Sequence, residues 1–297
     1  LPTSTGFNTV RENVGAVVNR GFDIRASYTI LQNIKERSFL TANVAISRNK
    51  NKLDKLSDAM KAYNDSQTAQ LKTNEDGEVK APAQLYYNGV SMDAIWGVRS
   101  LGIDPENGKE IYLTKDGLPT YTWNSADQVV LGDKLPKFQG TAGLSFEWKG
   151  FGGNASFRFQ YGAQMYNSTL ISKVENANLK NNADIRLFND VWRPGDEGQI
   201  KLYRATRYRD PETGWWRDAK ATDPTSRFVQ DRNEFSLSNL SLYYDFYRHK
   251  FLKKCGMERL RVSAYANELF MLSSIEIERG TSYPFARSFN FSVSVTF

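Results

Sequence analysis

The chain has 297 residues, and no stretch of it approaches the ~18 consecutive apolar residues that a membrane-spanning helix requires. Its 39 Lys and Arg outnumber its 33 Asp and Glu, but the charges are scattered and form no block that would follow phosphates, so nucleic acid is not an expected partner. The single cysteine, Cys255, excludes an internal disulfide and a multi-cysteine metal site, and the single histidine, His249, leaves little for imidazole catalysis, so no cofactor is expected.

Seven stretches alternate between apolar and polar residues, as β-strands with one apolar face do. In chain order they are residues 16–31, 40–47, 144–148, 155–165, 235–246, 260–266 and 288–297. The last of them, SFNFSVSVTF, has a phenylalanine or a valine at every second position and only small polar residues between them. Within the fifth stretch the apolar phase moves from Phe235 and Leu237 to Leu240 and Leu242, which predicts a β-bulge.

This alternation fits either a soluble β-sandwich or an outer-membrane β-barrel. The charges that lie well inside the strands all fall on the polar face. The connections also alternate in length: the short ones are about residues 32–37, 150–152 and 248–258, and the long ones are 51–137, 167–232 and 271–286. Outer-membrane barrels have short periplasmic turns and long extracellular loops. The pattern therefore favours an all-β fold, a transmembrane antiparallel β-barrel with long extracellular loops.

In such a barrel the apolar face contacts lipid and the polar face lines the lumen, because an Arg or Lys facing lipid near the midplane costs roughly 2–4 kcal/mol. The residues expected to face lipid are Phe157, Phe159, Phe289, Phe291 and Phe297. The residues expected to face the lumen are Arg25, Glu147, Arg158, Gln160 and Asn290.

Seven strands leave two free edges, and unpaired backbone groups at those edges would have no hydrogen-bond partner in lipid. Single-chain bacterial barrels also have an even number of strands, eight or more. We therefore expect the sequence to be part of a longer protein. Residues 288–297 should pair with residues 260–266 on one side and with polypeptide outside the sequence on the other, and the strand at residues 16–31 should lack a neighbour at its outer edge.

Seven motifs together span nearly the whole chain. They are NVGAVVNRGFDI (13–24), AISRNKNKL (45–53), SMDAIWGVRSLGIDPENGKEIYLTKDG (91–117), GDKLPKFQGT (132–141), PTSRFVQDRNEFSLSNLSLYYDF (224–246), ANELF (266–270) and ERGTSYPFARSFNFSVSVTF (278–297). In their order and spacing they resemble the C-terminal part of the SusC/RagA family of TonB-dependent outer-membrane transporters from Bacteroidetes-type bacteria.

The resemblance implies a large barrel with an N-terminal plug, in the outer membrane of a Gram-negative bacterium. Such a barrel is energised through a contact with the TonB complex and capped outside by a SusD-like lipoprotein. The sequence lacks the family's N-terminal half, so residues 1–297 would be the C-terminal part of the barrel domain, and TonB would be reached through the missing part. The implied function is active import of nutrient oligomers, either glycans or peptides.

The second long loop mixes tryptophans with arginines and carboxylates, a composition that suits stacking on sugar rings or peptide side chains and the clamping of carboxylates. This loop is the candidate for contact with substrate or lipoprotein, and the alternative is that its aromatic groups pack the loop against its neighbours. The candidate contact residues are Trp192, Arg193, Trp215, Trp216 and Arg217, together with Tyr283 near the outer rim, for which a role as a structural anchor is favoured.

In the first long loop, Asp104-Pro105 followed by Asn107-Gly108 predicts a turn between two short strands. The turn should make the loop compact.

An enzyme is not expected. The adjacent Asp196 and Glu197 cannot supply the two carboxylates that a glycosidase sets ~5–9.5 Å apart across a cleft. His249 lies on an expected periplasmic turn, far from any nucleophile on the outer face. The rival hypothesis is a soluble extracellular β-sandwich that binds carbohydrate through the tryptophans of residues 192–216. In the barrel the apolar stripes contact lipid, and in the sandwich they contact a second sheet.

Overall fold

The structure, a computed structural model, describes residues 15–73, 84–177, 184–204, 207–209, 213–218, 222–247, 249–275 and 287–297. Its contacts divide the chain into two units. The first, which we call the loop unit, consists of Leu1–Arg20, Lys50–Lys134 and Gln164–Gln230. The second, which we call the sheet unit, consists of Gly21–Asn49, Leu135–Ala163 and Asp231–Phe297.

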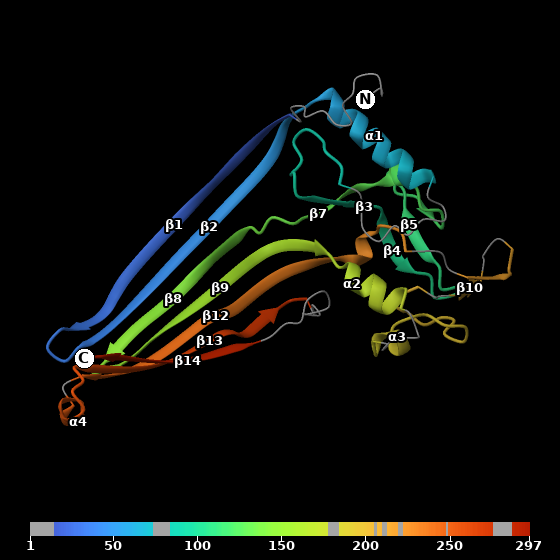
Figure 1. Cartoon of the computed structure of the whole chain (residues 1–297). Coiled ribbons are helices and arrows are strands. Elements are labelled where there is room, and N and C mark those ends of the chain that lie inside the picture. Colours follow the sequence, from blue (N-terminus) through green and yellow to red (C-terminus); the bar gives the residue numbers. More distant parts are fainter. Residues whose placement is uncertain are drawn as a thin grey trace, which may run out of the picture. The chain divides into compact units, whose positions relative to one another are not determined.

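Seven long strands form one sheet, in the order β1-β2-β8-β9-β12-β13-β14 (Figure 1). Their bounds are β1 Gly15–Asn33, β2 Ser38–Leu56, β8 Phe138–Trp148, β9 Phe151–Tyr166, β12 Val229–Tyr247, β13 Arg259–Ser273 and β14 Ser288–Thr296. All seven predicted strands are present, and the pairs β2–β8, β8–β9, β12–β13 and β13–β14 are antiparallel. The rival sandwich is wrong for these strands, because all seven belong to a single sheet instead of two packed ones.

The two edges of this sheet are β1 and β14. As predicted, β14 pairs with β13, from Ser288 opposite Asn267 to Thr296 opposite Arg259. Among the described residues β14 does not pair with β1, so these seven strands do not close a barrel by themselves.

The register confirms how the side chains divide between the two faces, because directly opposed residues share a face. On β9, Phe157 and Phe159 oppose an alanine and a glycine of β8, whereas Arg158 and Gln160 oppose a threonine and a glutamine. On β14 the phenylalanines and valines oppose apolar residues of β13, and Asn290 opposes a tyrosine. The sheet thus has one apolar and one polar face, while contact with lipid and lumen stays a prediction.

Two contacts extend the polar face across the other strands. The Oγ1 atoms of Thr29 and Thr41 lie 3.4 Å apart, so the odd-numbered residues of β1, Arg25 among them, share the face of the polar residues of β2. On β12, Tyr243 donates a hydrogen bond to Glu147 Oε2 of β8 at 2.9 Å.

The bulge predicted in β12 is confirmed. The register with β13 shifts between Leu237 and Asn239. On one side of the shift Phe235 stacks on Phe157 of the apolar face, with ring centroids 5.5 Å apart, and on the other side Tyr243 contacts the polar face. The odd-numbered residues of β12 therefore change face, as the sequence pattern required.

Shorter elements make up the loop unit. They are α1 Asp58–Thr73, β3 Ala94–Gly97, β4 Arg99–Ile103, β5 Glu110–Leu113, β6 Pro119–Thr120, η2 Ser125–Asp127, β7 Val129–Asp133, α2 Ser168–Leu170, η3 Ile171–Glu175, α3 Arg186–Asn189, β10 Arg207–Arg209, β11 Trp216–Asp218 and η4 Ser226–Phe228. β3 pairs with β7, β10 pairs with β11, and β4, β5 and β6 form a three-stranded sheet. A buried cluster that includes Val174 and Phe228 forms the core of this unit. In the sheet unit, the short helix α4 Lys250–Lys254 lies between β12 and β13.

The prediction of an all-β fold is confirmed in part: the fold is mostly β, but the first long loop begins with the helix α1. Its start signal is present in the sequence: Ser57 Oγ accepts a hydrogen bond from the Met60 backbone N–H at 3.3 Å, and Asp58 pairs with Lys61 at 2.7 Å. The strand before it also continues to Leu56, beyond its predicted end. Within the described part of the chain, no helix is both long enough and apolar enough to cross a membrane.

Candidate functional site

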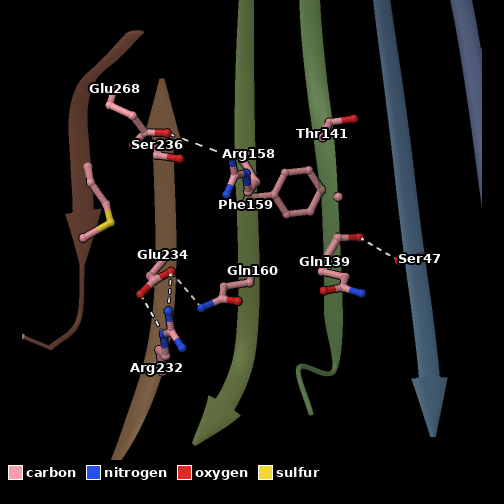
Figure 2. Close-up of a pocket in the computed structure, with 12 residues that line it drawn as sticks. Ser47, Gln139, Thr141, Arg158, Phe159, Gln160, Arg232, Glu234, Ser236 and Glu268 are labelled. Atoms are coloured by element: carbon pink, nitrogen blue, oxygen red, sulfur yellow. Dashed lines mark hydrogen bonds and ion pairs between the residues drawn. The ribbon is translucent and has the colours of Figure 1, made fainter. Parts of the chain in front are cut away.

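A pocket of about 540 Å³ lies on the sheet unit, across β8, β9, β12 and β13 (Figure 2). Its charged and amide groups are Arg158 and Gln160 of β9, Arg232 and Glu234 of β12, and Glu268 of β13. The sequence prediction placed Arg158 and Gln160 on the polar face, and the structure brings them together here. It missed the other three, although Arg232 and Glu234 stand within a motif that carries the family resemblance.

Charged groups of both signs face this pocket. Glu234 accepts hydrogen bonds from Arg232 Nε at 2.7 Å and from Gln160 Nε2 at 2.8 Å. Arg158 Nη2 lies 3.9 Å from Glu268 Oε1, and the Arg158 side chain is 67% exposed. An exposed pair at this distance contributes little to stability, so the Arg158 guanidinium can donate hydrogen bonds to a ligand.

Phe159 also reaches the edge of this pocket (Figure 2). Gly140 lies opposite Phe159, and a Cβ at Gly140 would lie 2.7 Å from Phe159 Cζ. The ring therefore occupies space that the glycine leaves open. Phe159, which is predicted to face lipid, therefore also packs against Gly140 of the neighbouring strand β8.

A cluster of ion pairs stands at the short-turn end of the polar face. Its members are Arg37, Glu147, Asp245, Arg259 and Arg261. Arg37 Nη2 lies 2.8 Å from Glu147, Arg261 Nη2 lies 3.0 Å from Asp245, and Arg259 also pairs with Asp245, whose side chain is fully buried. Glu147, predicted to face the lumen, therefore helps to join β8 to β12 and to the short turn before β2.

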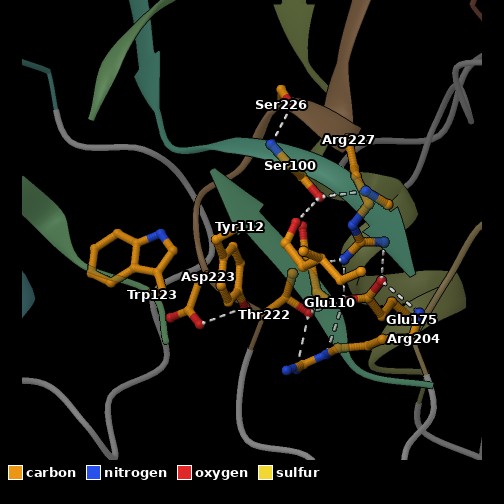
Figure 3. A network of polar contacts seen from close by, with 12 residues as sticks. Ser100, Glu110, Tyr112, Trp123, Glu175, Arg204, Thr222, Asp223, Ser226 and Arg227 are labelled. Carbon is orange, nitrogen blue, oxygen red and sulfur yellow. Dashed lines mark hydrogen bonds and ion pairs between the residues drawn. The ribbon is translucent and has the colours of Figure 1, made fainter. Parts of the chain in front are cut away.

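A buried ion network, the Arg227 network, holds the loop unit together (Figure 3). Arg227 of η4 lies 2.7 Å from Glu110 of β5 and 2.7 Å from Glu175 of η3. Glu175 also accepts a hydrogen bond from Thr222 Oγ1 at 2.7 Å and lies 3.2 Å from Arg204 Nε. Both carboxylates are only 1% exposed. The network joins the first long loop, through Glu110, to two parts of the second.

The charges in this network stabilise one another. Burial by itself raises the pKa of Glu175, but the guanidinium groups of Arg227 and Arg204 hold that pKa below its ordinary value. Burial lowers the pKa of Arg227, but Glu110 and Glu175 raise it above its ordinary value. Glu175 and Arg227 therefore stay charged at neutral pH, and their ion pair helps to hold the two long loops together as one folded body.

Trp192, a predicted contact residue, is 1% exposed and packs inside the loop unit. Its indole Nε1 donates a hydrogen bond to Pro105 O at 2.9 Å. The turn predicted at residues 104–108 is confirmed between β4 and β5, and Gly108 there has φ +72°. A Cβ at Gly108 would lie 2.3 Å from the indole ring. Trp192 thus packs the second long loop against the first, which was the alternative considered for these aromatic residues.

Substituting Gly108 by alanine is therefore expected to loosen the contact between the loops. The matched control is Gly102→Ala, because Gly102 also has a positive φ, +104°, but has no atom within 4 Å of an added Cβ. Both variants should incur about 1–2 kcal/mol of backbone strain, and only Gly108→Ala should incur a further 1–3 kcal/mol from overpacking. Hydrogen exchange of β4 and β5 in the complete receptor measures the difference, and equal protection in the two variants would contradict the packing role of Trp192.

The other candidate contact residues have different positions. Arg193 is exposed, with its guanidinium 5.3 Å from the Phe188 ring and Nη2 donating to Leu187 O at 2.8 Å. Trp215 is 75% exposed. Trp216 and Arg217 belong to β11, with only their backbone described, and Tyr283 lies outside the described residues. Contact with substrate or lipoprotein stays a prediction for all of them.

Comparisons with known proteins agree with this geometry. No family model matches the chain. In sequence it is similar to the TonB-dependent receptor P39 of Formosa agariphila, with 23% identity over 327 residues, covering 93% of this chain and 28% of that protein. Structures of the RagAB peptide importer in the open-open and closed-closed states match all of this chain with TM-scores of 0.72 each, at 18% and 17% identity. The chain is thus similar to part of a RagA-like TonB-dependent receptor.

The match covers 30% and 31% of those RagAB chains, so this RagA-like chain spans less than a third of the length of the relatives it matches. The seven-stranded sheet corresponds to part of the RagA barrel. TonB-dependent receptors are outer-membrane proteins of Gram-negative bacteria, and they are transporters rather than enzymes. The predicted outer-membrane location and the expectation of no enzymatic activity agree with this similarity.

Proposed function

We propose that this chain forms the C-terminal part of the barrel domain of a TonB-dependent importer of nutrient oligomers. The observation that carries the proposal is the division of one antiparallel sheet into a polar and an apolar face. On the apolar face Phe291 is 81% exposed and Phe289 61%, and Phe297, just beyond β14, is 81% exposed. A continuous row of exposed aromatic and aliphatic side chains marks a surface that contacts another apolar phase, and in a barrel that phase is lipid.

The polar face then lines the lumen, where the pocket at Arg158 and Glu234 offers hydrogen-bond donors and acceptors to a passing oligomer. Glycans and peptides both have such groups. The solved structures that the chain resembles are of a peptide importer, which supports peptides as one of the two substrate classes. Plug and TonB contact would be supplied by the remainder of the receptor.

The loop unit is proposed to lie outside the cell and to contact a SusD-like lipoprotein. The supporting observations are the length of its two loops and their folding into one body around the Arg227 network and Trp192. The short connections at the other ends of the strands are then periplasmic.

Protease treatment of intact cells that express the complete receptor tests this orientation. Once the lipoprotein is removed, chymotrypsin should cut after Trp215, which is 75% exposed. Trypsin should cut at Lys253 and Lys254 of α4, which are also exposed, only after the outer membrane is permeabilised. Cleavage at α4 in intact cells would show that the short connections lie outside the cell, which is the reverse of the proposed orientation.

Import is tested by growth on oligopeptides or oligosaccharides as sole nutrient. Deleting the gene of the complete receptor should abolish growth on one class of oligomer, while growth on the corresponding monomers is retained. Undiminished growth on both classes of oligomer would show that this receptor has another role.

A further inference from the structure

A second pocket, of about 570 Å³, lies in the loop unit on β1 and β2. Three basic residues line it: Arg20 of β1, and Lys50 and Lys52 of β2. Its other lining residues are Val18, Leu53, Asp54, Asn88 and Gly89. The pocket therefore has three positive charges and one negative charge.

The alternation along each strand places these basic groups on the apolar face of the sheet. On β1, Arg20 is in phase with the apolar residues from Phe22 to Ile30. On β2, Lys50 and Lys52 are in phase with the apolar residues of the segment 40–46. The apolar face thus turns basic toward the loop ends of these two strands.

The length of the apolar segment indicates the level of the pocket in a membrane. On β1 it runs from Phe22 to Ile30, and a tilted strand crosses a bilayer in about 9–11 residues. Arg20 is the next residue on that face, so it lies at the level of the lipid headgroups. In the orientation proposed above, on which this inference rests, the loop end belongs to the outer leaflet.

Within the part of the chain that the structure describes, these basic groups have no anionic partner of their own. Among the described residues, Arg20, Lys50 and Lys52 form no ion pair and no side-chain hydrogen bond. Like charges gathered on neighbouring strands repel one another, and a bound anion removes that repulsion.

Backbone hydrogen bonds fix the wall of the pocket next to β2. The Gly89 N–H donates to Leu53 O at 2.7 Å, and the Leu53 N–H donates to Val90 O at 2.9 Å. Gly89 has φ +80°, which suits a tight turn beside the strand. The turn at Asn88 and Gly89 is thereby held against β2.

We propose that this pocket binds the phosphate groups of lipopolysaccharide, the phosphorylated glycolipid of the outer leaflet. Arg20, Lys50 and Lys52 contact the phosphates at headgroup level. Val18, which lines the same pocket, lies beside the acyl chains. A phosphorylated lipid matches both the basic groups and the apolar lining of the pocket, whereas a free anion matches only the basic groups.

The test uses the complete receptor, purified in mild detergent and stripped of bound lipid. Native mass spectrometry measures its binding of bisphosphorylated lipid A, enzymatically dephosphorylated lipid A and inorganic phosphate. The test variant is R20Q/K50Q/K52Q. The matched control, K250Q/K253Q/K254Q, also removes three positive charges, but from α4 at the short-turn end of the sheet.

Each basic residue near an anionic membrane surface contributes about 1 kcal/mol, so R20Q/K50Q/K52Q should bind bisphosphorylated lipid A roughly 100-fold more weakly. The control variant should bind it as the wild type does, and the wild type should prefer the phosphorylated lipid. Equal binding by the two triple variants would overturn the proposal. So would equal affinity for dephosphorylated lipid A, which would indicate acyl-chain contact alone, or for inorganic phosphate, which would indicate a simple anion site.

If the triple variant fails to assemble, the wild-type comparison of phosphorylated and dephosphorylated lipid still decides, and the single variant K52Q should lose about 5-fold. Growth on nutrient oligomers is measured in parallel. Lost lipid discrimination with retained growth refutes only the lipid site, whereas retained discrimination with no growth phenotype on receptor deletion refutes only the proposed import.

Discussion

Replacing Arg227 by methionine is expected to lower the free energy of local unfolding of the loop unit by about 3–5 kcal/mol. The substitution leaves the carboxyl groups of Glu110 and Glu175, each only 1% exposed, without the guanidinium that pairs with both. Hydrogen exchange of the amides in β5 and η3 of the complete receptor measures the loss, because it reports local opening rather than unfolding of the whole barrel.

Two variants make this result specific. Arg193→Met removes an exposed guanidinium from the same unit and should change protection by no more than about 0.5 kcal/mol. The triple variant R227M/E110Q/E175Q removes the stranded charges as well and should recover most of the loss, since replacing a whole buried ion network is far less costly than breaking it. A loss in R227M no larger than in Arg193→Met would show that the network does not hold the loops together.

The same variant has a defined dependence on pH. In the wild type the pKa of Glu175 is held below its ordinary value, so its contribution is present above the unfolded pKa and is lost as the pH falls through the folded pKa. R227M removes one of the guanidinium groups that oppose the effect of burial, so the pKa of Glu175 rises in this variant. Protonation of Glu175 at acid pH then removes the unpaired buried charge. The difference in protection between wild type and R227M should therefore shrink from pH 7 to pH 4. A difference that stays constant would place its origin in packing.

The division of the sheet into two faces was predictable from the sequence because strand periodicity is a local property. SFNFSVSVTF assigns Phe291 and Asn290 to opposite faces whichever strand lies beside it, and the register with β13 agrees. The bulge was predictable for the same reason, since a change of phase between Leu237 and Leu240 is visible along one strand.

The interior of the loop unit was not predictable in this way because its contacts join distant parts of the chain. Arg227 and Glu110 are separated by 117 residues, and Trp192 and Pro105 by 87. A tryptophan has an apolar ring with one N–H donor, and such a side chain is equally typical of a binding surface and of a buried anchor. The sequence alone therefore left both roles open for Trp192. The burial of Trp192, its hydrogen bond to Pro105 and the position of Gly108 beneath the indole identify it as a buried anchor.

Substituting Phe291 by arginine is expected to reduce the amount of receptor folded in the outer membrane severely. Phe291 is 81% exposed, so the substitution removes little packing within the chain, and its cost arises from its surroundings. It lies inside β14 on the apolar face, where an arginine in lipid costs about 2–4 kcal/mol.

The matched control is Asn290→Arg, which introduces the same side chain one residue away on the polar face, opposite Tyr265. The measurement is the fraction of heat-modifiable, urea-resistant receptor in outer-membrane fractions. N290R should assemble nearly as well as the wild type, because its charge is solvated in the lumen. Phe291→Leu, which keeps the apolar character without the ring, should assemble as well as N290R does. If both arginine variants were lost equally, the difference between the faces would not be one between lipid and water, and the apolar face of β14 would have to be covered by protein instead.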